Sequence, residues 1–324
     1  MSSPTSDGVR ASDGALSGRA GQALTVTQRF LAPVLRLLVI LGVLLFLARG
    51  VDAAQVAELA SALPVSSLLA AFALCLINIL MGAFRWRAMM TAFGALRRPS
   101  FLDLFRATLA THFYNTFLPS GLGGDVVRSV VLRDAFAAPT TGLVSVVVER
   151  FIGLLALSLV AGLGFFLSPS LAPVEAYRPY LIVPVLLGVV ALFALGLTGR
   201  VRTYLSSLLL VSQPVVLAQA LGISVVGHGI NIALYVLLCV GLGLDLDPMA
   251  LCLVVPIALL ATAIPLSVVG VGPREVVLVT LLGALGVATP SALVVTLGFS
   301  LVNVTVALLG GLLVLVQPSL LRYQ

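Results

Sequence analysis

Residues 115–128 read N-T-F-L-P-S-G-L-G-G-D-V-V-R and lie between two apolar runs that are each too short to cross a bilayer. A similar string, I-P-L-S-V-V-G-V-G-P-R-E, returns at residues 264–275 in the same setting. Proline and glycine both weaken a helix, so these strings are the places where an otherwise helical chain is expected to break. We interpret them as the tips of two re-entrant hairpins.

The composition places the chain in a lipid environment. Of its 324 residues, 60% are hydrophobic and only 9% are charged, with a mean hydropathy of +1.19. Ordinary soluble domains have about 25% charged residues. The sequence therefore predicts an all-α polytopic membrane protein. The net charge of +6 comes from arginines spread over loop ends, which is a topology signal, so we expect no nucleic-acid partner.

On either side of the two strings, the apolar runs of the sequence predict about six full transmembrane spans and two broken pairs of shorter helices. The predicted spans are Leu31–Ala48, Leu63–Phe84, Thr140–Leu167, Tyr180–Leu197, Pro214–Leu242 and Ser291–Val316. The broken pairs are Phe101–Leu118 with Val126–Phe136, and Met249–Ile264 with Pro273–Leu285. Residues 1–28 are rich in Ser, Gly and Ala without an apolar core, which predicts a disordered cytoplasmic tail.

The positive-inside rule gives these spans an orientation. With the N-terminus in the cytoplasm, most loop and terminal arginines lie inside, and the outer loops contain only Arg49 and Arg178. This distribution requires both broken pairs to return to the side they entered. The first repeat (29–172, hairpin 101–136) and the second (173–324, hairpin 249–287) then have opposite orientations, as in many secondary transporters. We expect a multi-pass protein of the bacterial inner (plasma) membrane with both termini cytoplasmic.

Two pairs of adjacent opposite charges, Glu149-Arg150 and Arg274-Glu275, lie at predicted membrane depth. An ionisable side chain there costs about 2.5–3.5 kcal/mol, so it usually faces the protein interior. Neighbours on a helix point in different directions, and we expect each charge to pair with another element, Asp125 with Arg274 or Glu149 with Arg128. Such charges either hold the bundle together by ion pairs or present arginines to an anionic headgroup.

Other polar residues also allow two interpretations. The pairs His112 and Asn115, and His228 and Asn231, each lie one helical turn apart and either line a headgroup path or form inter-helix hydrogen bonds. The segment Arg85-Trp86-Arg87 is expected to be an interfacial anchor at a helix exit, or else a contact for lipid headgroups. Two histidines without clustered carboxylates predict no metal site, and we expect no cofactor.

The strings at residues 118–125 with Arg128, at Glu149-Arg150 and at residues 265–275 resemble the flippase-like membrane domain of lysylphosphatidylglycerol synthases. The resemblance covers about Leu31 to Val316. It implies transbilayer movement of a lipid, in one branch an aminoacylated phosphatidylglycerol. The residues that it implies for substrate binding and translocation are Asn115, Pro119, Gly121, Gly123, Gly124, Asp125, Arg128, Glu149, Arg150, Gly270, Gly272, Arg274 and Glu275.

Two departures from the family pattern bear on the substrate. Many members have a further glycine where this chain has Val269, so the second tip is expected to be stiffer. No synthase domain follows Val316, so we expect a protein other than the bifunctional enzyme, and its lipid need not be aminoacylated.

The sequence thus favours a lipid translocase without enzymatic activity. The tips would enclose a polar cavity in which Arg128, Arg150 and Arg274 bind a phosphate-bearing headgroup, anionic or zwitterionic. No nucleotide-binding G-x-x-x-x-G-K string is present, which argues against a built-in ATP drive. One alternative is a non-transporting scaffold for a separate lipid- or glycan-modifying enzyme. Another is an intramembrane transferase, for which the candidate general bases are Asp125, Glu149 and His112.

Overall fold

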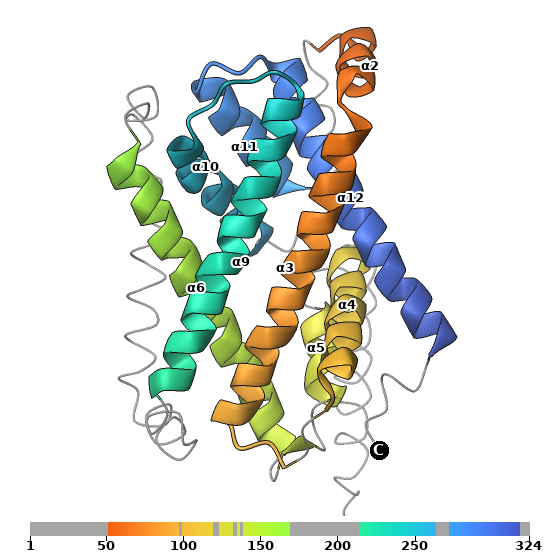
Figure 1. Ribbon diagram of the computed structural model, residues 1–324, viewed down its shortest axis with the longest axis vertical. Coiled ribbons are helices and arrows are strands. Elements are labelled where there is room, and N and C mark those ends of the chain that lie inside the picture. The colour runs from red at the N-terminus through yellow and green to blue at the C-terminus, as the bar shows by residue number, and fades with distance from the viewer. Residues whose placement is uncertain are drawn as a thin grey trace, which may run out of the picture.

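The structure is a computed structural model that describes residues 51–96, 99–118, 123–131, 135–136, 139–168, 214–263 and 272–317. All regular secondary structure in these ranges is helical (Figure 1). Four helices are long and apolar enough to cross a membrane: α3 (Val65–Ala92), α6 (Pro139–Leu167), α9 (Pro214–Gly241) and α12 (Thr289–Val316). The fold is that of a multi-pass helical membrane protein.

These four helices confirm four of the predicted spans. A helix of 28 residues, such as α3, is about 42 Å long at 1.5 Å per residue, which exceeds the roughly 30 Å hydrocarbon core. The other two predicted spans, Leu31–Ala48 and Tyr180–Leu197, lie outside the described residues. The predicted loop around Glu58 is instead a short helix, α2 (Ala53–Ala62), whose first turn is capped by Asp52 through a 2.9 Å bond from the Ala54 amide.

The prediction that the second span ends at Phe84 is wrong. Helix α3 continues to Ala92, so Arg85 and Trp86 lie within it and not at a helix exit. Trp86 is 1% exposed and belongs to a buried cluster with residues of α4, and therefore cannot be an interfacial anchor. Only Arg87 of this segment is exposed.

Helices end within or just before both strings where breaks were predicted, and new helices begin within them. Helix α4 (Phe101–Phe117) ends at Leu118, whose backbone is extended, and α5 (Gly123–Val131) begins beyond it. Helix α10 (Pro248–Leu260) tightens into the 3₁₀ turn η4 (Ala261–Ala263), and α11 (Pro273–Ala284) follows. The tip residues Pro119, Gly121 and Gly270 lie outside the described residues.

Each broken pair is packed together at a different end of the bundle. Helices α4 and α5 contact each other in the lower half of Figure 1, and α10 and α11 contact each other in the upper half. The long helices α3 and α9 pack along each other between them. Helix α12 crosses α4, which places the first broken pair against the last span.

The helices recur along the chain with nearly constant spacing. Helices α3 and α9 have 28 residues each and begin 149 positions apart, at residues 65 and 214. Helices α5 and α11 begin 150 positions apart, at residues 123 and 273, as do α6 and α12, at residues 139 and 289. The two broken pairs therefore occupy equivalent places in two similar series of helices.

A glycine permits the crossing of α4 and α12. A Cβ atom added at Gly310 would collide with the backbone carbonyl of Leu109, and backbone cannot move aside as a flexible side chain can. We expect Gly310→Ala to lower the free energy of unfolding by about 1–3 kcal/mol, the usual effect of overpacking. The measurement is thermal unfolding in detergent followed by the fluorescence of Trp86, the single tryptophan.

The control is Gly283→Ala, because nothing lies within 4 Å of a Cβ at this exposed position of α11. Since alanine favours helix more than glycine does, that variant should be as stable as the wild type or more so. Equal unfolding temperatures for the two variants would show that the α4–α12 crossing does not depend on Gly310.

Candidate functional site

A polar cavity of about 440 Å³ lies inside the bundle, between α3, α4, α5, α6 and α9, near the end of α10. Ionisable and polar residues are rare within membrane spans and generally face the interior, where they mark functional paths. The polar residues that line this cavity are Asn78, Arg85, Thr108, Thr111, His112, Asn115, Asp125, Arg128, Glu149, Arg150, Ser224, His228, Asn231 and Thr262.

The centre of the cavity wall is the carboxylate of Glu149, which is 3% exposed and shared by two arginines. Its Oε1 atom accepts a hydrogen bond from Arg85 Nε at 2.9 Å, and its Oε2 atom forms an ion pair with Arg128. Arg85 also donates to the Ser224 hydroxyl at 3.3 Å. This network joins α3, α5, α6 and α9. The predicted pairing of Glu149 with Arg128 is confirmed.

Aromatic packing completes the environment of Arg128. Its guanidinium carbon lies 4.4 Å from the centroid of the Trp86 ring, within the range of a cation–π interaction. Arg128 is itself 8% exposed. The Trp86 ring and the Glu149 carboxylate therefore both hold Arg128 in place in the last turn of α5.

The predicted pairing of Asp125 with Arg274 is wrong, because Asp125 forms an ion pair with Arg150. Adjacent helical side chains point about 100° apart, so Glu149 is directed into the bundle while Arg150 is directed along the cavity wall. The Arg150 side chain is 46% exposed and that of Asp125 is 15% exposed. Asp125 also lies in the first turn of α5, where the helix dipole stabilises a negative charge.

The beginning of α5 is fastened to α4. The Gly124 amide donates to the Asn115 side-chain oxygen at 2.8 Å. A Cβ at Gly124 would collide with the backbone oxygen of Thr111, and one at Gly123 would lie 2.5 Å from the Leu118 side chain. These two glycines therefore let α5 pack closely against the end of α4, and Asn115 orients the helix that carries Asp125 and Arg128.

Both histidines line the cavity and bind a neighbouring helix. His112 Nε2 donates to the Asn303 carbonyl at 3.3 Å, and His228 Nε2 donates to the Gly153 carbonyl at 3.0 Å. Because a carbonyl only accepts, each ring carries its proton on Nε2 when it makes this bond. The predicted inter-helix hydrogen bonds are confirmed for both histidines, and Asn115 and Asn231 also line the cavity, whereas the headgroup path stays a prediction.

Arg274 and Glu275 form a second, separate cluster. They are 6% and 0% exposed, and neither is among the described residues that line the cavity. Glu275 accepts hydrogen bonds from Arg274 Nε at 2.9 Å, from the Ser300 hydroxyl at 3.2 Å and from the Gly272 amide at 2.6 Å. The Arg274 guanidinium lies 4.6 Å from the Phe299 ring centroid.

The expectation that adjacent charges do not pair is wrong at this cluster. Glu275 is the third residue of α11, and its side chain folds back to cap the Gly272 amide. That fold-back places the carboxylate beside Arg274. The cluster joins the start of α11 to α12 through Ser300. The predicted charged site residues thus divide between the polar cavity, which Asp125, Arg128, Glu149 and Arg150 line, and a buried brace formed by Arg274 and Glu275.

Sequence reasoning missed the role of Arg85. Its position beside Trp86 suggested a membrane interface, whereas the structure places it on the cavity wall. The apolar segment Ala88-Met89-Met90 could have predicted that Arg85 lies inside the helix, because it extends the helix by another turn beyond the two arginines.

The long apolar helices and the charged cavity within them define a polytopic membrane protein with a polar site inside its helix bundle. Residues 34–311 match the family described as Lysylphosphatidylglycerol synthase TM region. The match covers most of the chain, and the protein belongs to this family. Comparison with curated proteins and with solved structures gave no significant match to either.

The two clusters should differ in their effect on stability. We expect Arg274→Ala to lower the free energy of unfolding by about 3–5 kcal/mol, because it removes a charge partner from the fully buried Glu275. Arg150→Ala should lower it by about 1 kcal/mol or less, because the Arg150 side chain is nearly half exposed. Trp86 fluorescence during thermal unfolding compares the two variants. Similar losses in both would contradict the division into a brace and a cavity wall.

Proposed function

We propose that this protein moves a phosphate-bearing lipid across the bilayer and binds the headgroup in the polar cavity. The observation that carries the proposal is the arrangement of Arg85, Arg128 and Arg150 around one cavity within a membrane-spanning bundle. Arginine is suited to this task because its planar guanidinium donates several hydrogen bonds to phosphate oxygens.

The charge balance of the cavity supports an anionic headgroup. Among the described residues that line it, three arginines stand against two carboxylates, Asp125 and Glu149. Glu149 is divided between Arg85 and Arg128, so its single negative charge compensates two cations only in part. A phosphodiester carries one negative charge and would balance the remainder. Asp125, near the partly exposed Arg150, offers an acceptor for an ammonium group on an aminoacylated or zwitterionic headgroup.

The recurrence of the helices supports a transport mechanism. The spacing of about 150 residues and the placement of the broken pairs towards opposite ends in Figure 1 fit two re-entrant hairpins in an inverted repeat. In such transporters one repeat rocks against the other and exposes a site alternately to each side. With the N-terminus in the cytoplasm, the arginine distribution satisfies the positive-inside rule.

The test is lipid movement in proteoliposomes, with fluorescent phosphatidylglycerol and a cationic aminoacylated analogue compared side by side. We expect wild-type protein to move the anionic lipid faster. Arg150→Ala should slow movement about 10-fold or more, because a charge-assisted hydrogen bond contributes about 1.5–3 kcal/mol and 1.4 kcal/mol is a factor of ten. The matched control is Arg87→Ala, which removes an exposed arginine of α3 that does not line the cavity.

Three outcomes would contradict the proposal. No movement of either lipid by folded wild-type protein would favour the scaffold, and a co-purifying lipid- or glycan-modifying enzyme would then be sought. Equal slowing by Arg150→Ala and Arg87→Ala would mean that the effect arises from lost surface charge and not from the cavity. Chemical change of the lipid headgroup during the assay would favour the transferase.

A further inference from the structure

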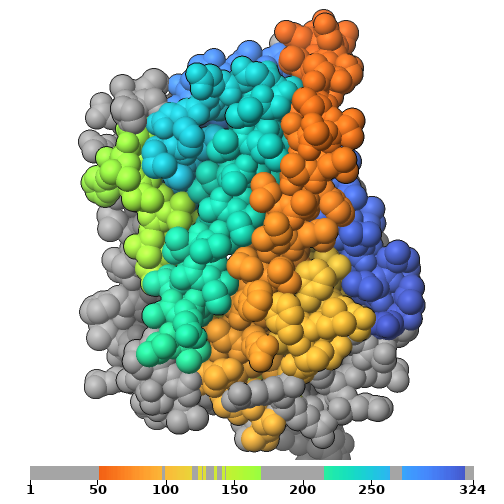
Figure 2. All heavy atoms as spheres, viewed as in Figure 1, coloured from red at the N-terminus to blue at the C-terminus, as the bar shows by residue number. Residues whose placement is uncertain are grey.

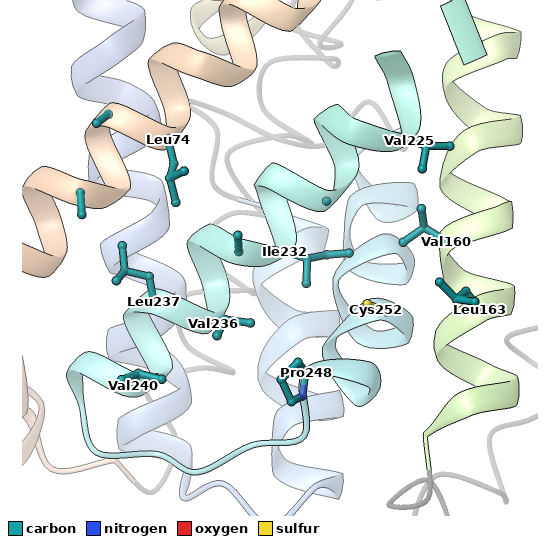
Figure 3. Close-up of a pocket in the computed structure, with 14 residues that line it drawn as sticks. Leu74, Val160, Leu163, Val225, Ile232, Val236, Leu237, Val240, Pro248 and Cys252 are labelled. Carbon is teal, nitrogen blue, oxygen red and sulfur yellow. The ribbon is translucent and has the colours of Figure 1, made fainter. Parts of the chain in front are cut away.

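A second hollow, which we name the α9 groove, has a volume of about 790 Å³ and lies along α9 (Figure 3). It is bordered by α3 on one side and by α6 and the start of α10 on the other. Helix α9 reaches the molecular surface between these neighbours in Figure 2. Every lining residue within the described part of the chain is apolar: Ala70, Ala73, Leu74, Val160, Leu163, Val225, Gly229, Ile232, Ala233, Val236, Leu237, Val240, Pro248 and Cys252.

A glycine keeps the floor of the α9 groove open. Gly229 is exposed, and a Cβ atom built on it would have no heavy atom within 4 Å. Its absent side chain therefore serves no close helix contact in the structure. Val225 before Gly229 and Ile232 and Val236 after it line the same groove (Figure 3). Gly229 therefore leaves this part of the groove unobstructed.

The α9 groove continues the polar cavity along the same helices. On α6, Leu157 lines the cavity and Val160, about one turn further, lines the groove. On α3 the same step leads from Asn78 to Leu74. On α9 the two hollows overlap between positions 223 and 232, where they lie on neighbouring faces of the helix about 100° apart. A molecule with a polar end in the cavity and an apolar tail would therefore find a surface suited to each part.

The length of this combined path fits a lipid chain. From Arg85 at the cavity to Ala70 at the far part of the groove, α3 advances 15 residues, or about 22 Å at 1.5 Å per residue. One leaflet of a bilayer contributes about half of the roughly 30 Å hydrocarbon core. The path is long enough to accompany an acyl chain over its whole length.

We infer that the α9 groove seats one acyl chain of the lipid whose headgroup occupies the polar cavity. The inference rests on the proposed function of the cavity. It specifies the substrate as a lipid that is bound both by its headgroup and by one acyl chain. Polar contacts fix the headgroup, and van der Waals packing against the groove orients the tail, because a chain that is already in lipid gains nothing from exclusion of water. Water-soluble headgroup analogues lack this second contribution.

The test uses phosphatidylglycerol with a photoreactive diazirine halfway along one acyl chain, in proteoliposomes of the full chain. Crosslinked peptides are identified by mass spectrometry. We expect crosslinks at residues 225–240 of α9 and at Val160 or Leu163 of α6. Arg150→Ala should reduce them about 10-fold, because weaker headgroup binding leaves the chain unanchored.

A glycine pair supplies the matched variants. Gly229→Leu fills the groove and should abolish the α9 crosslinks and slow lipid movement while leaving the headgroup contacts in place. Gly222→Leu is the control, because Gly222 is also exposed on α9, has no atom within 4 Å of a Cβ and lines neither hollow. This variant should crosslink and transport as the wild type does.

The outcomes separate the inference from the proposed function. Crosslinks that persist unchanged in Arg150→Ala would show that the groove holds bulk bilayer lipid, and would overturn the inference even if transport is observed. A Gly229→Leu variant that loses self-association without a change in lipid crosslinks would assign the groove to a second copy of the chain, which also overturns it. Crosslinks that depend on Arg150 in a protein that moves no lipid would support the inference and refute the translocase.

Discussion

The ion pairs that the Glu149 carboxylate forms with Arg85 and Arg128 are the interactions on which the arrangement of the polar cavity depends. One nearly inaccessible negative charge binds Arg85 of α3 and Arg128 of α5, and Arg85 reaches Ser224 of α9. Inside a membrane no water is present to replace these partners, so each charge stabilises the position of the others. Four helices are thereby joined at the wall of the polar cavity.

Close helix approach is the second constraint, and it determines where the cavity lies. Gly124 brings α5 against the backbone of α4 at Thr111, and Gly310 brings α12 against α4 at Leu109. In lipid the association of helices relies on packing and hydrogen bonds, because hydrophobic exclusion from water is absent. The glycines at these crossings allow α4 and α5 to pack closely within the bundle. This packing places Asp125 and Arg128 at the cavity.

The two broken pairs occupy equivalent positions in the series of helices but have different chemistry. Beside α5 the charges line an open polar cavity, whereas beside α11 the pair Arg274 and Glu275 is sealed by Ser300 and the Phe299 ring. Tyr235 stacks on Phe299 at 4.5 Å and closes the α9 side of this brace. Similar helix order thus accompanies a polar cavity in one half and a buried ion-pair cluster in the other.

The sequence alone determined the membrane class, the four described spans and the positions of both helix breaks, because apolar run length, glycine and proline act locally. It also identified the buried charges and the pairing of Glu149 with Arg128, since isolated charges in lipid require partners. Only the tertiary structure decided that Arg85 belongs to the cavity, that Asp125 faces Arg150, and that Arg274 and Glu275 stand apart. Helical periodicity predicts which residues share a face of a helix. Which other helix packs against that face depends on the packing of segments that are distant in the sequence.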